Sequence, residues 1–196
     1  MAYGFNQCGS GYYPWPGNNP PRIFSTGPDN PDKHPKKPLD YTGINLRNEP
    51  VHVLLADDDA DDRELFTEVL DDSGIKVKLE CAVDGKNLIE MLASPGAKLP
   101  HVIFLDLNMP NKSGKECLDF IRQSEKLKQV PVVIYSTSSS QKDIDDTFEK
   151  GANLYVTKPS SYNELLATIR RVLSIDWDHF KRATSRTDYV FSLRDR

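Results

Sequence analysis

Charged and hydroxyl side chains follow four short apolar runs of this sequence, at the point where each run ends. Three consecutive aspartates come after the first run, a single aspartate closes the third, a serine closes the fourth, and a lysine follows the fifth. If these runs are parallel strands of one sheet, their carboxyl ends share one edge, which is where open α/β sheets bind ligands. That edge would collect Asp57, Asp58, Asp59, Asp106, Ser136 and Lys158.

Crowded carboxylates at such an edge need a positive charge to hold them together. They repel one another strongly at a few ångströms unless a cation neutralises them, and oxygen-only ligands of this kind suit Mg²⁺. Capping of the following helix explains Asp59, Asp61 and Asp62. It does not explain a lone aspartate on a different strand, so the predicted metal ligands are Asp57, Asp58 and Asp106.

From Val51 onward, short apolar runs alternate with helical patterns, and this alternation predicts the fold class. The first, third and fourth runs are almost entirely apolar, as expected for parallel strands covered on both faces. Between the runs, apolar residues recur at helical spacing. Five strand–helix repeats predict a doubly wound α/β domain with right-handed crossovers. The expected strands are VHVLLA (51–56), KVKLECAV (76–83), HVIFLDL (101–107), PVVIYS (131–136) and NLYVT (153–157).

Composition divides the chain into three parts. Residues 1–50 are rich in proline, glycine and asparagine and show no apolar period, which predicts a flexible leader. Residues 51–173 carry the strand–helix repeats and form the predicted domain. Residues 174–196 are a C-terminal extension, in which we expect the last helix to continue before the chain packs back onto the domain or onto a partner. We expect this extension to be too short for a DNA-binding output domain.

Bulk properties argue against several classes of function. The net charge of −4 is mild, and the sequence gives no clustered basic face for nucleic acid. No apolar run approaches the roughly 20 residues of a membrane-spanning helix, and the start of the chain does not read as a secretory signal. Three widely spaced cysteines, Cys8, Cys81 and Cys117, argue against a disulfide framework. We therefore expect a cytoplasmic protein that binds neither nucleic acid nor membrane.

Four runs of the sequence, taken together, resemble the receiver domains of bacterial response regulators. These runs are LLADDDADDRELF, IFLDLNMPNKSG, VVIYSTSSS and GANLYVTKP. The resemblance covers residues 51–173 and implies a flavodoxin-like fold, with a five-stranded parallel sheet in the order 2-1-3-4-5. The details TSSSQKDI, GANLYVTKP and Trp177 are more similar to stand-alone receivers, including those paired with bacteriophytochrome kinases, than to the receivers of transcription factors.

The resemblance implies roles for the acidic residues at the sheet edge. Asp106 is the expected phospho-acceptor. Asp58 is expected to bind Mg²⁺ directly, together with Asp106 and the carbonyl of Asn108, while Asp57 would hold the metal mainly through water. A carboxylate is a weak nucleophile, so the metal would make the reaction feasible by absorbing charge on the phosphoryl oxygens.

Three further residues match the parts of the family that respond to the phosphoryl group. Lys158 would supply a second cation to the phosphoryl oxygens, and these oxygens would draw the Ser136 hydroxyl across by a charge-assisted hydrogen bond. That movement vacates space into which the Tyr155 ring can turn. The expected output surface lies on the fourth helix, the fifth strand and the fifth helix, and it would include Ile144, Phe148 and Tyr155.

The resemblance therefore implies a single-domain response regulator of a two-component system or phosphorelay, which catalyses only its own phosphorylation and dephosphorylation. Its expected partner is a sensor histidine kinase or a phosphotransfer protein. A homodimer through the apolar C-terminal residues Ile175, Trp177 and Phe180 stays open, because these residues could equally pack onto their own domain.

Three other functions compete with this interpretation. A phosphatase of the haloacid-dehalogenase class would need a second aspartate two residues after Asp106, where this chain has Asn108. A flavodoxin-like FMN module would need a hydroxyl- and glycine-rich loop after the first strand, where three aspartates lie. A phosphorylation-independent interaction module on the same fold is disfavoured by the complete set of acidic, hydroxyl and lysine side chains, but it is not excluded.

Overall fold

A parallel β-sheet forms the centre of the domain. The computed structural model describes residues 49–177, 180, 185–191 and 193. Among them, five strands pair in the order β2-β1-β3-β4-β5, and every pairing is parallel. The predicted doubly wound α/β fold and its 2-1-3-4-5 order are therefore confirmed. The strands are β1 (Val51–Ala56), β2 (Val77–Ala82), β3 (Val102–Leu105), β4 (Val132–Ser136) and β5 (Leu154–Thr157).

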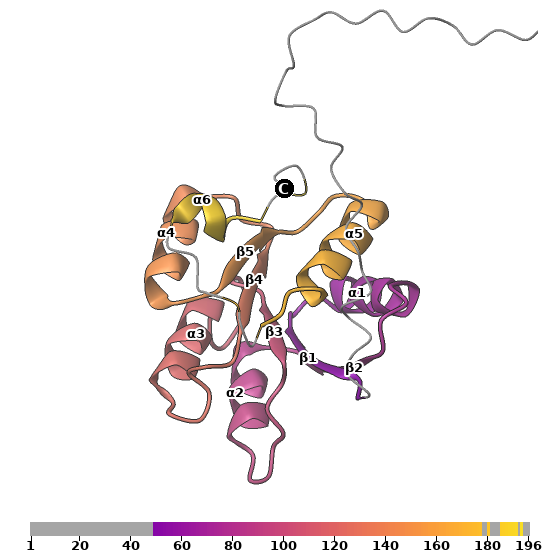
Figure 1. Cartoon of the computed structure of the whole chain (residues 1–196). Helices are drawn as coiled ribbons and strands as arrows, with labels where there is room; N and C mark the ends of the chain where they lie inside the picture. The colour runs from indigo at the N-terminus through magenta and orange to yellow at the C-terminus, as the bar shows by residue number, and fades with distance from the viewer. Residues whose placement is uncertain (1–48, 178–179, 181–184, 192, 194–196) are drawn as a thin grey trace, which may run out of the picture. The chain divides into compact units, whose positions relative to one another are not determined.

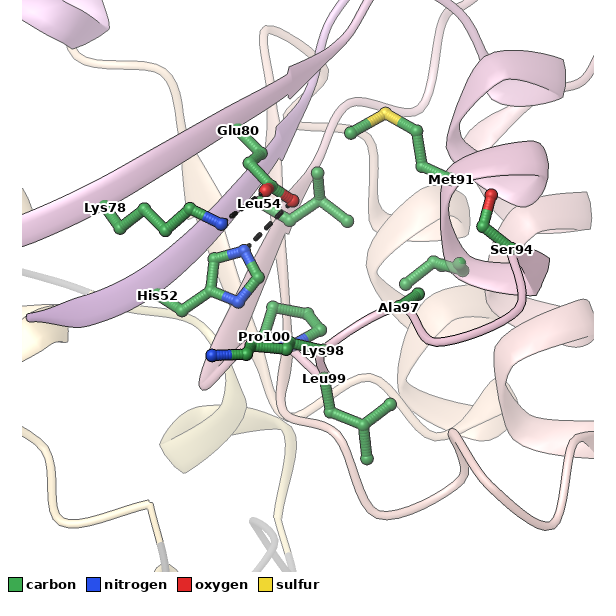
Figure 2. A pocket seen from close by; sticks show the side chains of 11 residues that line it. His52, Leu54, Lys78, Glu80, Met91, Ser94, Ala97, Lys98, Leu99 and Pro100 are labelled. Atoms are coloured by element: carbon green, nitrogen blue, oxygen red, sulfur yellow. Dashed lines mark hydrogen bonds and ion pairs between the residues drawn. The ribbon is translucent and has the colours of Figure 1, made fainter.

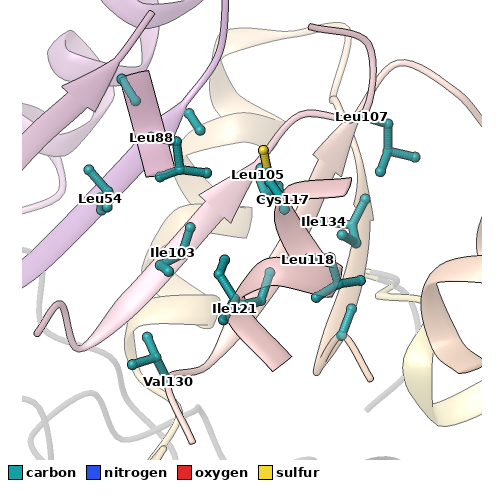
Figure 3. Close-up of a cluster of buried hydrophobic side chains, with 14 of the residues drawn as sticks. Leu54, Leu88, Ile103, Leu105, Leu107, Cys117, Leu118, Ile121, Val130 and Ile134 are labelled. Atoms are coloured by element: carbon teal, nitrogen blue, oxygen red, sulfur yellow. The ribbon is translucent and has the colours of Figure 1, made fainter. Parts of the chain in front are cut away.

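Helices cover both faces of this sheet (Figure 1). On one face lie α1 and α5, whose buried residues share a cluster with Val53 and Phe104. On the other face lie α2, α3 and α4, whose buried residues share a cluster with Leu54 and Ile103 (Figure 3). The helices are α1 (Ala60–Asp72), α2 (Gly85–Ala93), α3 (Gly114–Gln123), α4 (Gln141–Lys150), α5 (Tyr162–Leu173) and the short α6 (Arg186–Tyr189).

The apolar character of the central strands follows from this double coverage. Successive side chains of a strand point to opposite faces, so Val53 and Leu55 enter one core cluster while Leu54 and Ala56 enter the other. All four residues of β3 and all five of β4 are buried. Uninterrupted apolar runs are therefore required at β1, β3 and β4.

Side chains directly before the helices fix where each helix begins. Asp59 accepts hydrogen bonds from the N–H groups of Asp61 and Asp62 at the start of α1. Asp84, Ser113, Ser140 and Ser161 cap α2, α3, α4 and α5 in the same way. Such caps satisfy N–H groups that have no partner within the helix. The loops at the carboxyl edge of the sheet are thus anchored at their far ends.

The C-terminal extension departs from one expectation. Helix α5 ends at Leu173 and does not continue, because the next apolar residues, Ile175 and Trp177, turn back and pack against the cluster under α1 and α5. The Trp177 ring also contacts Phe180, with ring centroids 4.9 Å apart. Ile175 and Trp177 thus pack onto their own domain. The predicted leader over residues 1–50 lies almost wholly outside the described residues, which begin at 49.

None of the described helices combines the length and the apolar character that crossing a membrane requires.

Candidate functional site

An acidic cluster lies at the carboxyl edge of the sheet. Asp57 and Asp58 directly follow β1, and Asp106 directly follows β3, the strand that pairs with β1. One carboxylate oxygen from each of the three residues lies within 4.8 Å of the others. Asp57 and Asp106 are buried, whereas Asp58 is exposed. The predicted trio is thus brought together, with one open side.

Asp57 is held by the loop that follows it and by helix α1. Its Oδ1 accepts the N–H of Asp59 at 3.1 Å, and its backbone carbonyl accepts a hydrogen bond from Arg63 Nη1 at 2.7 Å. Burial raises the pKa of the Asp57 carboxyl above its ordinary value, and this effect exceeds the opposing effect of Lys158. The cost of burying the negative charge of Asp57 is therefore only partly offset by the protein's own groups.

Lys158 is the cation of this site. Its Nζ lies 2.7 Å from Asp57 Oδ2, 2.7 Å from Asp62 Oδ2 and 3.7 Å from Asp106 Oδ2. Burial alone would lower the pKa of Lys158, but its hydrogen bonds to Asp57 and Asp62 and the charge of Asp106 raise it overall. Lys158 therefore stays protonated, and its single charge is shared among three carboxylates.

The loop after Asp106 passes close behind this residue. The Asp106 Oδ1 accepts the N–H of Leu107 at 2.6 Å, which leaves Oδ2 as the oxygen nearer to Lys158. Gly114 begins α3 directly behind it, and a Cβ at this position would lie 2.1 Å from the Asp106 carbonyl oxygen. Only glycine fits so close an approach. Asn108 is exposed in the same loop.

The donor atoms of this edge fit a hard divalent cation. They are carboxylate oxygens, they lie close enough to share one ion, and Asp58 opens the cluster to solvent. The raised pKa of Asp57 shows that its charge is costly to bury, and a bound cation would remove that cost. Oxygen ligands with room for water are what Mg²⁺ requires.

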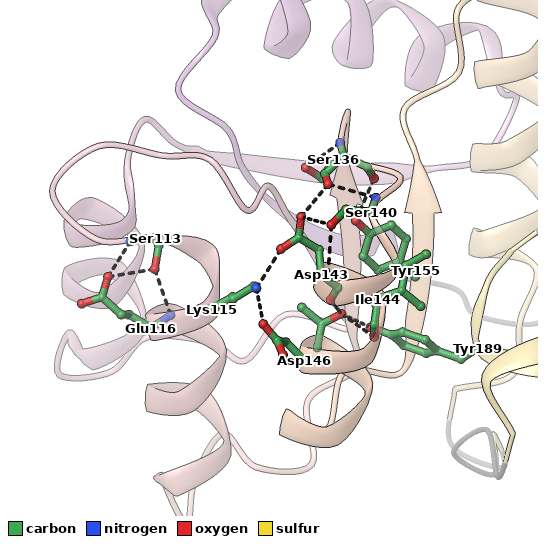
Figure 4. A network of polar contacts seen from close by, with 12 residues as sticks. Ser113, Lys115, Glu116, Ser136, Ser140, Asp143, Ile144, Asp146, Tyr155 and Tyr189 are labelled. Atoms are coloured by element: carbon green, nitrogen blue, oxygen red, sulfur yellow. Dashed lines mark hydrogen bonds and ion pairs between the residues drawn. The ribbon is translucent and has the colours of Figure 1, made fainter.

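Ser136 and the loop after it form the next part of the edge. The buried Ser136 Oγ accepts the Ser138 N–H at 3.4 Å. Ser138 Oγ in turn donates to Asp143 Oδ2 at 2.5 Å, and Asp143 Oδ1 pairs with Lys115 Nζ of α3 at 2.8 Å (Figure 4). Hydrogen bonds from Lys115, Ser138 and Ser140 lower the pKa of Asp143 to about 2. A fixed negative charge thus anchors the loop over residues 137–140.

Tyr155 reaches the same loop from β5. Its ring is completely buried, and its hydroxyl donates to the Ser138 carbonyl at 2.8 Å. Ser138 therefore contacts both predicted switch residues, since its N–H bonds Ser136 and its carbonyl accepts from Tyr155. Movement of one can reach the other through a single residue.

Comparison with known proteins agrees with this arrangement. The model of the response regulator receiver domain family matches residues 53–170. The chain belongs to this family. It is therefore a receiver-domain response regulator of the kind found in two-component systems. Receiver domains bind Mg²⁺ at an acidic pocket and interact with histidine kinases or phosphotransfer proteins.

Several similar receivers have names that refer to phytochromes or have bound metal. Response regulator Rcp1 of Synechocystis sp. is 34% identical over 131 residues, which cover 65% of this chain and 89% of Rcp1. Its Mn²⁺-bound crystal structure superposes with a TM-score of 0.60 at 32% identity, covering 69% of this chain and all of that one. The phosphorylated cyanobacterial phytochrome response regulator RcpA gives a TM-score of 0.60 at 28% identity, with coverage of 70% and 100%. The bacteriophytochrome response regulator RtBRR gives 0.56 at 28% identity, with coverage of 72% and 89%.

The sequence pattern did not predict that two further residues belong to this site. Asp62 was assigned to helix capping alone, yet its carboxylate shares Lys158. Asp143 was not singled out, yet it anchors the loop between the two predicted switch residues. The available signal was position in a helix: Asp62 lies in the first turn of α1 and Asp143 in the first turn of α4, and both helices begin at the carboxyl edge of the sheet.

A separate pocket of the receiver lies at the opposite, amino end of the strands (Figure 2). His52 near the start of β1 lies 3.1 Å from Glu80 of β2, and Glu80 also pairs with Lys78 at 2.6 Å. Leu54, Met91 and Leu92 supply apolar walls. None of the predicted site residues lines this pocket.

Proposed function

We propose that this receiver accepts a phosphoryl group on Asp106 from a phosphohistidine of a sensor histidine kinase or a phosphotransfer protein. The observation that carries the proposal is the position of Asp106, which lies within 4.8 Å of Asp57 and Asp58 and 3.7 Å from Lys158. A nucleophilic oxygen beside two further carboxylates and one shared ammonium group is poorly suited to a structural role. It is well suited to hold a dianionic phosphoryl group together with a metal ion.

The transfer would proceed by in-line displacement. Asp106 Oδ2 attacks the phosphorus atom, a P–O bond forms as the P–N bond to the donor histidine breaks, and the departing imidazole takes up a proton. Asp57, Asp58, Asp106 and the Asn108 carbonyl would hold Mg²⁺, which offsets charge on the phosphoryl oxygens when bound. Lys158 would leave its position between the carboxylates to contact a phosphoryl oxygen, which gives these oxygens a second cation.

Signalling would then follow from Ser136 and Tyr155. A phosphoryl oxygen would draw the Ser136 hydroxyl towards it. In the present structure this hydroxyl accepts a long hydrogen bond from the Ser138 N–H. Movement of the loop over residues 137–140 would displace the Ser138 carbonyl and so remove the acceptor of the Tyr155 hydroxyl. Phosphorylation would thereby change the surface of α4, β5 and α5, and a partner that prefers one arrangement would shift the population.

The remaining features of the proposal concern the whole chain. We assign residues 51–173 to the receiver domain and 174–196 to a C-terminal extension. Cys81 and Cys117 are free thiols, which is consistent with a cytoplasmic location. A homodimer through the surface of α4, β5 and α5 is one way in which the receiver could signal. The alternative, a phosphorylation-independent module, gives no reason to bury Asp57 and Asp106 beside Lys158.

Phosphorylation of the full chain by a small acyl-phosphate donor tests the proposal. With Mg²⁺ present, mass spectrometry should detect one added phosphoryl group, and the group should be lost with the Asp106→Asn substitution. Asp71→Asn, on the exposed end of α1, removes a carboxylate outside the site and should label normally. Labelling that survives Asp106→Asn contradicts the assignment of the acceptor.

A further inference from the structure

The segment of residues 185–191 covers the face formed by α4 and the outer edge of β5. Helix α6 lies beside α4 (Figure 1), and Arg186 pairs with Asp145 of α4 at 2.7 Å and with Glu149 at 3.8 Å. Tyr189, at the end of α6, is completely buried. This segment therefore contributes one of the largest fully buried side chains among the described residues.

Tyr189 is bound through both its ring and its hydroxyl. The hydroxyl donates to Thr147 Oγ1 of α4 at 2.8 Å. The ring lies against Phe148, with centroids 5.2 Å apart, and against Tyr155, with centroids 6.0 Å apart. A buried tyrosine usually needs a partner for its hydroxyl, and Tyr189 has one in Thr147. The contact is therefore specific.

The backbone of the segment also completes the edge of the sheet. β5 is an edge strand, and edge strands present unpaired backbone groups. Val190 forms a parallel bridge with Tyr155, and the Phe191 N–H donates to the Tyr155 carbonyl at 2.8 Å. Tyr155 thus meets the segment through its ring and its backbone, while its hydroxyl contacts the Ser138 carbonyl (Figure 4).

We propose that residues 185–191 are a tethered ligand of the α4–β5 face, bound in the unphosphorylated protein and released from that face when Asp106 is phosphorylated. This proposal rests on the proposed function. The physical link is Tyr155: movement of Ser138 towards the site removes the acceptor of its hydroxyl, and a freed Tyr155 ring no longer forms the wall on which Tyr189 packs. Release would expose an apolar groove with the acidic rim of Asp145 and Glu149.

The uncovered groove would then bind a segment of a partner protein that carries a basic and an aromatic side chain. The tethered ligand itself shows what fits: a basic side chain opposite Asp145 and, three residues later, an aromatic side chain that reaches Thr147 and Phe148. An extended residue pairing with β5 follows. We therefore infer that the partner contributes a short basic and aromatic segment, which competes with residues 185–191.

Hydrogen exchange at Phe191 tests the release directly. Beryllofluoride, which occupies the place of a phosphoryl group on a carboxylate, is added to the full chain with Mg²⁺. The Phe191 amide should lose protection on beryllofluoride binding, whereas the core amide of Ile103, bonded to the Pro131 carbonyl, should keep it. Unchanged protection at Phe191 overturns the proposal. Retained protection in a newly formed dimer also overturns it, because the segment would then bind a second copy.

Reciprocity supplies an independent test. If phosphorylation weakens binding of the segment, loss of the segment's contacts must tighten beryllofluoride binding by up to the same factor, and we expect roughly 5-fold or more. Tyr189→Ala should show this increase in affinity. Tyr189→Phe loses only the hydroxyl bond to Thr147, so it should show a smaller increase. Tyr162→Ala is the matched control, because Tyr162 of α5 bonds Asp72, away from α4.

The two proposals fail in different ways. If the wild-type protein and Asp106→Asn alike do not bind beryllofluoride, the proposed function is wrong. If the wild-type protein binds it but Tyr189→Ala binds it with unchanged affinity, Asp106 accepts the group and the tethered ligand is uncoupled from it. That second outcome overturns this inference alone.

Discussion

The two ends of the parallel sheet both carry ionisable side chains, but their charges are balanced at only one end. At the amino end, Glu80 lies 2.6 Å from Lys78 and 3.1 Å from His52, so a single carboxylate meets two basic groups. At the carboxyl end, Lys158 is the one lysine among the described residues that pairs with Asp57, Asp62 and Asp106, and Asp58 lies beside them. The two groups of side chains lie at opposite ends of one sheet, on or next to β1 and its neighbouring strands.

The difference distinguishes an ordinary structural ion pair from the metal and phosphoryl site that we propose. At the amino end, the Glu80 carboxylate has a cation of its own in Lys78. The carboxyl end keeps an excess of negative charge beside a buried carboxylate, an arrangement that is unfavourable until a cation binds. Perturbed groups of this kind gather at functional sites. Substitutions at the two ends should therefore have different effects on both activity and stability.

The largest expected effect is on phosphorylation. Asp58→Ala should slow labelling by the acyl-phosphate donor about 100-fold or more, because a bound metal is worth several kilocalories per mole to this reaction. The rate is measured by mass spectrometry at a series of Mg²⁺ concentrations. Asp61→Ala, an exposed neighbour in the first turn of α1, is the matched control. Labelling at the wild-type rate in EDTA contradicts a role for Mg²⁺.

The next effect is on stability and concerns Lys158. Lys158→Ala should lower the free energy of unfolding by about 3 kcal/mol in EDTA, because it leaves Asp57 buried without a cation. Mg²⁺ should restore more stability to this variant than to the wild type. Urea unfolding followed by circular dichroism measures both. Lys78→Ala at the amino end should cost about 0.5 kcal/mol or less, and an equal loss for the two lysines would remove the contrast.

Much of this contrast could be predicted from the sequence, because it depends on strand ends. Continuous apolar runs fixed the positions of the strands, so Asp57, Asp106 and Ser136 could be placed at one edge. The roles proposed for the site residues stay predictions, which the experiments above test. These residues are Asp57, Asp58, Asp106, Asn108, Ser136, Tyr155 and Lys158.

Contacts between distant segments could not be predicted in the same way. The pairing of Asp62 with Lys158 depends on how the first turn of α1 faces the end of β5. The burial of Tyr189 depends on a chain reversal after α5, at a point where the helical pattern gave reason to expect a longer helix. Neither has a period or a motif, because each arises from the packing of elements far apart in the sequence.

A smaller effect of opposite sign is expected at Asp57. Asp57→Asn should raise the free energy of unfolding by about 1 kcal/mol at pH 7 in EDTA, although it impairs the site. Burial raises the folded-state pKa of Asp57 above its unfolded value, so its ionised form costs stability above the folded-state pKa. The gain should shrink as the pH falls towards about 4, where the unfolded chain is also protonated. A gain that grows on acidification contradicts this assignment.

The smallest effect is expected at Glu80, and its pH dependence should have the opposite direction. The hydrogen bond from Lys78, followed by the one from His52, lowers the pKa of Glu80. The ionised Glu80 therefore stabilises the fold at a pH above its unfolded-state pKa. This stabilisation is lost as the pH falls through the folded-state pKa. With 38% of the side chain exposed, Glu80→Gln should cost only about 0.5 kcal/mol or less at pH 7. Urea unfolding with and without Mg²⁺ should give the same loss, and labelling of Asp106 should be unchanged. A Mg²⁺-dependent loss would show that the two ends of the sheet are coupled, and a gain in stability at pH 7 would show that the amino end is unbalanced as well.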